Sequence, residues 1–239
     1  MTGPRNATTT YKGRTYTWPG DDPVIEYQSV TTILSGGVPK PALPNWAAKS
    51  VAEWAVDNHA QVGDIIETEG KIEAVRILKG KPWSQRDKAA DLGSRCHAAA
   101  EAYVLGQPMP EWEDDVKPYM ASFCAFLEDH RPDYELTEAT VYNRKYGYAG
   151  TLDFIARIGD GLVLGDIKTG KGVYGEVALQ LAAYRYAEFI GLPDGNEAPV
   201  PPVDSAAVLH LTPRKYELVP VEADEAAFRT FLYAQQVSH

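Results

Sequence analysis

Two carboxylates and a lysine lie close together in the second half of the sequence. Asp166 and Lys168 are two residues apart at the end of an apolar run, and Asp153 belongs to the apolar run before it. Two neighbouring carboxylates repel each other, so one is protonated unless a cation lies between them. A hard divalent cation such as Mg²⁺ prefers oxygen ligands, and a lysine beside it can position water or stabilise charge on a phosphate. These residue types predict metal-dependent hydrolysis of a phosphodiester bond.

The spacing of these residues predicts a β-hairpin that brings them to one patch. Residues 148–158 and 162–167 are rich in β-formers and are separated by a Gly-Asp-Gly turn. Because strand side chains two residues apart share a face, the acid and the lysine of the second strand point the same way. Pairing about the turn places Asp153 near residue 167, adjacent to Asp166.

Further helices and strands must position this hairpin. Helical periodicity predicts helices at 29–34, 46–55, 65–77 with an interruption at Gly70, 84–105, 113–130, 175–190 and 224–236. β-Formers predict strands at 14–18, 24–27, 134–142, 207–211 and 217–221, whereas residues 1–13 are expected to be loose. This order predicts an α/β or α+β sandwich. No linker is evident, so we expect one domain over 1–239, with a core at 84–239 after strands and helices at 1–83.

Two of the predicted helices carry polar residues suited to the same chemistry. Gln180 and Tyr184 are four residues apart, so they share a helix face and can hydrogen-bond a phosphate or a base. His97 lies in a slim helical stretch rich in glycine and alanine, where it can approach the sheet and complete a metal site. Glu101, one turn further on, is a candidate to orient this histidine. Each residue alone also fits a structural role, so only their combination is informative.

In combination, these residues resemble the PD-(D/E)XK nuclease superfamily and, within it, the RecB-type branch. That branch includes phage exonucleases and the CRISPR-associated Fe–S nucleases. Its pattern is a helical histidine, then Gly-x-x-Asp, Asp/Glu-x-Lys and Gln-x-x-x-Tyr. Within residues 92–190 the pattern reads His97, Gly150-Thr-Leu-Asp153, Asp166-Ile-Lys168 and Gln180-Leu-Ala-Ala-Tyr184. Segments 29–34 and 39–49 also look like phage-encoded members.

The resemblance implies a restriction-endonuclease-like core, in which helices flank a central mixed sheet, with a helical region towards the N-terminus. It implies Mg²⁺ or Mn²⁺ as cofactor, with Lys168 assisting the attacking water. The implied metal ligands are His97, Asp153, Asp166 and the carbonyl of Ile167. Gln180 and Tyr184 are implied to contact the DNA strand near the cut. Glu138, in the strand before Asp153, is a candidate additional acid, and an ordinary surface position is the alternative.

The sequence departs from the family pattern at two points. Leu152 replaces the proline that names the superfamily, as it does in several of its branches. Cys96 and Cys124 are the only two cysteines, too few for a four-cysteine site, so we expect no Fe–S cluster. They fit a reducing cytoplasm, which is the host cytoplasm if the protein is phage-encoded. No stretch approaches the roughly 18 apolar residues of a membrane span, so no membrane partner is expected.

The charge of the chain limits the ways in which it can bind nucleic acid. With 23 Lys+Arg against 33 Asp+Glu, the net charge is −10, which argues against coating nucleic acid by bulk charge. Residues 144–171 are nevertheless locally basic, with five basic and three acidic residues. The basic residues are Arg144, Lys145, Arg157, Lys168 and Lys171, and the acidic residues are Asp153, Asp160 and Asp166. Lys171 is therefore a candidate DNA contact. Four further residues can extend this groove or simply keep the surface solvated: Arg95, Arg185, Arg214 and Lys215.

The leading hypothesis is a metal-dependent DNA nuclease, an exonuclease of phage DNA recombination, replication or repair that can act with a partner protein of those processes. A catalytically silent nuclease-fold module that binds DNA or a partner is the alternative from another class. The presence of Asp153, Asp166 and Lys168 together argues against this alternative, because a binding module has no need of all three. An unrelated α/β domain with a chance motif is the third hypothesis. Strand preference, digestion polarity and the choice between end and internal cutting stay open.

Overall fold

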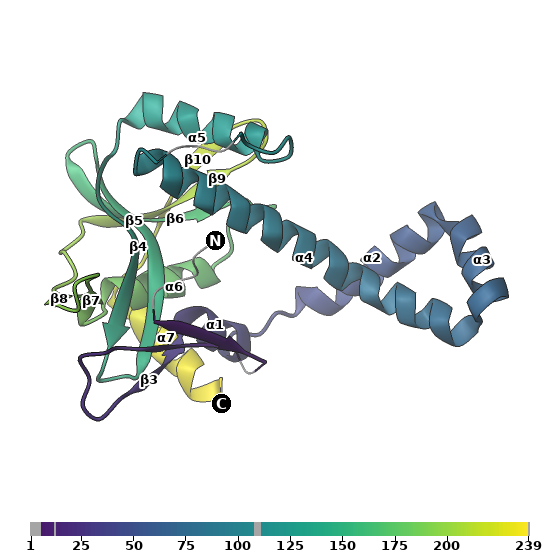
Figure 1. The fold of residues 1–239 in the computed structure, drawn as a ribbon, viewed down its shortest axis with the longest axis horizontal. Helices are drawn as coiled ribbons and strands as arrows, with labels where there is room; N and C mark the ends of the chain where they lie inside the picture. The colour runs from purple at the N-terminus through teal and green to yellow at the C-terminus, as the bar shows by residue number, and fades with distance from the viewer. Residues whose placement is uncertain (1–5, 12, 108–110, 239) are drawn as a thin grey trace. The chain divides into compact units, whose positions relative to one another are not determined.

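The computed structural model describes residues 6–11, 13–107 and 111–238 of the chain (Figure 1). The chain divides into two compact units. Pro39–Ser94 forms one of them, which we call the helical unit, and the residues before and after it form the other, which we call the sheet unit. Helix α4 (Lys71–Val104) contributes its residues up to Ser94 to the helical unit and its remainder to the sheet unit.

The helical unit consists of α2 (Ala42–Asp57), α3 (His59–Glu69) and the first part of α4. The predicted interruption at Gly70 is confirmed, because this glycine adopts a φ of +87° between α3 and α4. The prediction that a new helix begins at Ser84 is wrong, since Ser84 lies inside α4. Pro82 also lies inside this helix, where it removes one backbone donor without ending the helix.

The sheet unit is built around a mixed sheet with ten strands in the described residues, which confirms the α/β prediction. The strands are β1 (Ala7–Thr10), β2 (Gly13–Thr17), β3 (Glu26–Ser29), β4 (Asp133–Asn143), β5 (Tyr148–Ile158), β6 (Gly161–Lys168), β7 (Phe189–Gly191), β8 (Glu197–Ala198), β9 (Ser205–Leu211) and β10 (Tyr216–Val221). They follow the order β1-β2-β3-β5-β4-β7-β8, while β6 pairs with β5 and β9, and β10 pairs with β9. The pairs β3–β5 and β6–β9 are parallel, and the others are antiparallel.

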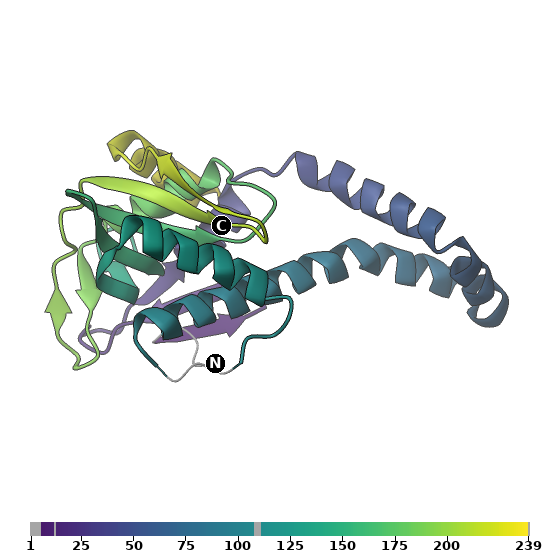
Figure 2. The same cartoon turned by 90° about the horizontal axis from the view of Figure 1, so that it is seen from above.

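Helices cover the sheet on both sides (Figure 2). Helices α1 (Val30–Gly37), α6 (Glu176–Arg185) and α7 (Glu225–Val237) share one core with β4, β5, β6 and β9. In this core, the ring centroids of Tyr148 from β5 and Phe231 from α7 are 5.0 Å apart. On the other side, α5 (Lys117–His130) lies beside the C-terminal turns of α4, where Phe123 contacts Tyr103 with ring centroids 6.3 Å apart.

Most predicted elements are found within a few residues of their expected bounds, and the exceptions have local causes. β1 is a strand where loose chain was expected, because it pairs with β2. The helix expected from residue 113 begins at Lys117, so Pro118 occupies its first turn, where a missing backbone N–H costs nothing. The helix expected to reach residue 190 ends at Arg185, because Phe189 and Ile190 pair with β4 as β7.

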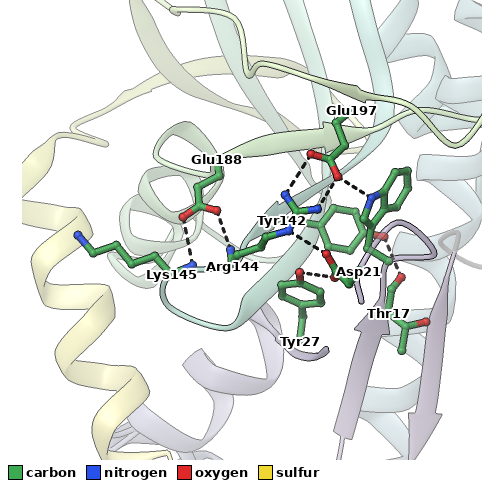
Figure 3. Close-up of polar contacts among 9 residues, drawn as sticks. Thr17, Asp21, Tyr27, Tyr142, Arg144, Lys145, Glu188 and Glu197 are labelled. Carbon is green, nitrogen blue, oxygen red and sulfur yellow. Dashed lines mark hydrogen bonds and ion pairs between the residues drawn. The ribbon is translucent and has the colours of Figure 1, made fainter. Parts of the chain in front are cut away.

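Figure 3 shows a polar network around Arg144, the residue that follows β4. Its guanidinium donates from Nε to Asp21 Oδ1 at 2.8 Å and also pairs with Glu197. Glu197 accepts from the indole N–H of Trp18 at 2.8 Å, and Glu188 accepts from the backbone N–H of Arg144 at 3.0 Å. This arginine joins the turn after β2 to β4 and β8. Because carboxylates satisfy its charge, it adds little to the local basic character expected of 144–171.

The fold depends on a close approach of Phe154 to Gly165 across the β5–β6 pair. These residues are partners in the antiparallel register, and a Cβ on Gly165 would lie 1.8 Å from Cζ of Phe154. We expect Gly165→Ala to lower the free energy of unfolding by about 1–3 kcal/mol, as overpacked cores do. Urea unfolding measures this change. Gly161→Ala on the same strand is the control, because its Cβ would meet nothing closer than 3.8 Å; an equal loss in both variants would contradict the explanation.

Candidate metal centre

The β5–β6 hairpin brings Asp153 to the backbone of Ile167. The regular pairing runs from Ile158↔Gly161 to Phe154↔Gly165. Beyond that pair, the backbone N–H of Ile167 donates to Asp153 Oδ2 at 2.6 Å. The prediction that Asp153 lies near residue 167 is confirmed. The carboxylate fills the place that a backbone carbonyl takes in a regular ladder, and it keeps its remaining lone pairs for other partners.

Three side chains from three elements converge beside this contact. His97 from α4, Glu138 from β4 and Asp153 from β5 each offer one ligand atom, and these atoms all lie within 4.8 Å of one another. His97 Nδ1 is 3.4 Å from Asp153 Oδ2. The group lines a cavity of about 20 Å³, measured as the space open to the centre of a water-sized sphere. Roughly 10–15 Å³ on this measure holds one water molecule, so the cavity has room for a cation or a water.

Glu138 is held in an unusual backbone conformation. Its φ is +48°, in the left-handed region that residues other than glycine rarely occupy, although it lies in the middle of β4. Its neighbours Thr137 and Ala139 pair with Phe154 and Leu152, so Glu138 stands opposite Asp153. The side chain lines the cavity, so the alternative of an ordinary surface position does not hold. Backbone strain of this kind persists only where the surrounding structure imposes it, and it is frequent at functional sites.

Asp166 and Lys168 form a second group next to the first. Asp166 is buried, with Oδ2 2.7 Å from Lys168 Nζ, and its Oδ1 accepts from Lys168 Nζ at 2.8 Å. Gln180 from α6 donates to the same Oδ1 at 2.9 Å. Burial and the charge of Asp153 raise the pKa of Asp166 to about 6, although Lys168 opposes this shift. Burial opposes the charge of Lys168, but Asp166 and Asp153 more than compensate, so the pKa of the lysine lies above its usual value.

The acids around the cavity are crowded. Burial and the charges of Asp153, Glu101 and Asp166 raise the pKa of Glu138 to about 8. Glu101 lines the same cavity, one turn after His97 on α4. Without a cation, the metal-free protein relieves this repulsion by retaining protons. A divalent cation relieves it without protons, and two carboxylates with an imidazole suit Mn²⁺ or a similar ion. The donor set therefore fits the metal that the sequence predicts.

Two of the predicted DNA contacts, Tyr184 and Gln180, interact with residues of the site itself. Tyr184 is buried, and its ring packs against Gly150. A Cβ at position 150 would lie 2.5 Å from Cε1 of Tyr184, which explains the glycine in Gly-x-x-Asp. Gln180 lies 3.3 Å from the Tyr184 hydroxyl while it holds Asp166. Arg185 donates to the backbone carbonyl of Val203 at 2.9 Å. Of the predicted contacts, Lys171 is the exposed one.

Sequence reasoning missed Tyr134 at this site. It lines the cavity from β4, and its buried hydroxyl has no hydrogen-bond partner among the described residues. A tyrosine in a strand is an ordinary β-former, so its type alone carried no signal. A water molecule in the cavity would satisfy the hydroxyl, because buried polar groups are generally hydrogen-bonded.

Comparisons with known proteins add no assignment to this geometry. No protein-family model matches the chain, and a comparison with curated proteins gives no match. Within the residues that the structure describes, no helix combines the length and the apolar character needed to cross a membrane.

The raised pKa of Glu138 predicts how stability depends on pH in the metal-free protein. Between its ordinary pKa of 4.5 and about 8, the folded state keeps a proton that the unfolded state loses. The free energy of unfolding therefore falls as pH rises through this window. In EDTA we expect Glu138→Gln to stabilise the protein at pH 8 by an amount on the order of 2 kcal/mol more than at pH 5.

Thermal unfolding at the two pH values measures this difference. Glu135→Gln is the matched control, since Glu135 lies on the same strand with an exposed side chain that pairs with Arg157. A Glu138→Gln effect that is the same at both pH values would show that Glu138 titrates normally.

Proposed function

We propose that this protein is a metal-dependent DNA nuclease that hydrolyses phosphodiester bonds. One observation carries the proposal: a lysine paired with a buried carboxylate lies next to a His–Glu–Asp group suited to a divalent cation. Lys168 and Asp166 make the pair, and His97, Glu138 and Asp153 make the group. Four of these five residues, His97, Asp153, Asp166 and Lys168, are also positions of the pattern by which the sequence resembles RecB-type nucleases.

The metal is Mg²⁺ or Mn²⁺ in this proposal, and the histidine in the donor set favours Mn²⁺. His97, Glu138 and Asp153 hold it, and Asp166 and the carbonyl of Ile167 are further candidate ligands. When bound, the ion lowers the pKa of a water and polarises a phosphoryl oxygen. Asp153 is already oriented for this role, because the Ile167 N–H fixes one of its oxygens.

Lys168 is the proposed catalytic residue on the protein side. Its ammonium is held by Asp166, and Gln180 fixes the orientation of that carboxylate from α6. In the reaction, water attacks phosphorus, the bond to the leaving oxygen breaks, and the leaving oxygen gains a proton. A lysine at this position orients the attacking water and stabilises the negative charge that develops on the phosphoryl oxygens. Its raised pKa keeps it charged for this purpose at neutral pH.

Release of label from end-labelled linear DNA tests the proposal directly. We expect cleavage in Mn²⁺ or Mg²⁺ and none in EDTA, and Lys168→Ala should slow cleavage at least about 100-fold, as the loss of such groups does. Lys49→Ala, which removes an exposed lysine of α2, should cut at the parent rate. Equal cleavage by the parent and Lys168→Ala would point to a contaminant or to another site.

The same assay separates the remaining alternatives. A closed circular substrate that resists cutting indicates an exonuclease, and labels at the two ends give the polarity. DNA that is bound but never cut supports the silent module, or an enzyme that needs a recombination or replication protein. Circular dichroism of Lys168→Ala shows whether the protein still folds when the buried Asp166 has lost its partner.

Metal binding has a readout that does not require activity. We expect Mn²⁺ to bind the metal-free chain in a calorimetric titration and to raise its unfolding temperature, because a ligand of the folded state alone stabilises it. Asp153→Asn should weaken binding by more than about tenfold. Asp160→Asn, in the exposed turn of the same hairpin, is the control and should bind as the parent does. Unchanged affinity in Asp153→Asn would remove this residue from the metal centre.

A further inference from the structure

The helical unit buries little of its own apolar surface. Within 39–94, the residues classed as fully buried are Ser50, Ala74 and Pro82. Large side chains stay open to solvent on its helices, among them Ile72 at 89% exposure and Trp83 at 42%. Aromatic residues such as tryptophan are enriched at binding interfaces relative to the rest of a protein surface.

One face of α4 combines this tryptophan with cations. Ile72, Arg76, Lys79, Trp83 and Arg86 follow one another at spacings of four, three, four and three residues. At 3.6 residues per turn, these spacings keep all five side chains on one side of the helix. We call this surface the α4 stripe. From Arg76 to Arg86 it extends about 15 Å along the helix axis.

The charges of the helical unit are separated along α4. Residues 76–88 hold five basic residues and a single acid, Asp87, while the acids of α3 and of the first turn of α4 lie before them. Arg76 pairs with Glu73, and Arg86 pairs with Asp87, both on the exposed surface of α4. Exposed pairs of this kind are worth about 0–1 kcal/mol. A phosphate can therefore replace the carboxylates at little cost.

The tryptophan ring is held in place by its neighbours. The Trp46 ring from α2 meets the Trp83 ring edge-on with centroids 6.4 Å apart, and the Arg86 guanidinium lies 5.1 Å from the Trp83 centroid. Lys81 covers the Trp54 ring at 3.9 Å on the same unit. A held aromatic ring loses little conformational entropy when a planar partner stacks on it.

We propose that the α4 stripe binds single-stranded nucleic acid, with a base stacked on Trp83 and phosphates paired with Arg76, Lys79 and Arg86. Aromatic stacking beside a basic track is the general way in which proteins hold single strands without reading sequence. A second copy of this chain is a poorer occupant, because two identical basic stripes repel each other. That the strand is DNA rests on the proposed function; the stripe itself does not depend on hydrolysis.

Fluorescence anisotropy with labelled oligo(dT) and the full chain in EDTA tests the stripe without any cleavage. We expect Trp83→Leu to weaken binding at least about fivefold, whereas Trp83→Phe keeps most of the affinity, because only the aromatic ring stacks. Replacing Arg76, Lys79 and Arg86 together by glutamine should lower the slope of log K against log salt by about 2, at about 0.7 per phosphate contact.

A matched charge control uses exposed cations outside the stripe: Lys49, Lys117 and Arg229, each changed to glutamine. This triple variant should bind as the parent does. The proposal is overturned if the parent does not bind the strand, if both stripe variants bind unchanged, or if sedimentation shows that Trp83→Leu breaks a dimer instead. Strand binding that depends on the stripe, without metal-dependent cleavage, would support the proposed role of the α4 stripe and reject the proposed nuclease function. Metal-dependent cleavage with stripe variants that bind unchanged would support the nuclease function and reject the role of the stripe.

Discussion

The hydrogen bond from the Ile167 N–H to Asp153 joins β5 to β6 at the point where their regular pairing stops. A side chain replaces a backbone acceptor there, so the strands stay together while a carboxylate faces the cavity. Gly165 allows the approach by leaving room for the Phe154 ring directly before this point. Asp153 belongs to the metal group, and Asp166 and Lys168 are the neighbours of Ile167 in the chain. A change in the hairpin register would therefore dismantle both groups together.

Electrostatic repulsion is the second constraint, and it explains why the centre resembles a binding site more than a structural salt bridge. Lys168 compensates Asp166, but no ion pair compensates Glu138 among the described residues, and the pKa of Glu138 rises to about 8. The left-handed backbone of Glu138 directs a further acid towards Asp153 rather than away from it. Both features cost stability in the metal-free protein, and a divalent cation removes the electrostatic cost.

The sequence predicted the parts of this site that depend on local spacing. Asp166 and Lys168 share a strand, and the hairpin turn fixes Asp153 beside residue 167, so period-two geometry was sufficient. Glu138 was a candidate because it lies in the strand before Asp153, but its left-handed backbone conformation was not predicted, since its residue type does not favour it. The continuation of α4 through Pro82 was also not predicted. It depends on whether the helix on both sides of the proline outweighs the loss of one hydrogen bond. Tyr184 is buried because its ring packs against Gly150. The spacing of the sequence alone cannot distinguish this packed position from a position in contact with DNA.

The distribution of charge between the units removes the apparent conflict between an acidic chain and a nucleic-acid substrate. The helical unit holds eight basic and eight acidic residues, so the net charge of −10 belongs entirely to the remainder of the chain. Acidic groups are needed at a metal centre, where they repel a strand until the cation is present. In the binding that we propose, cations gathered on the α4 stripe would hold a strand without making the whole surface attractive to nucleic acid. Binding and hydrolysis would then depend on different residues, with salt weakening the first and metal removal abolishing the second.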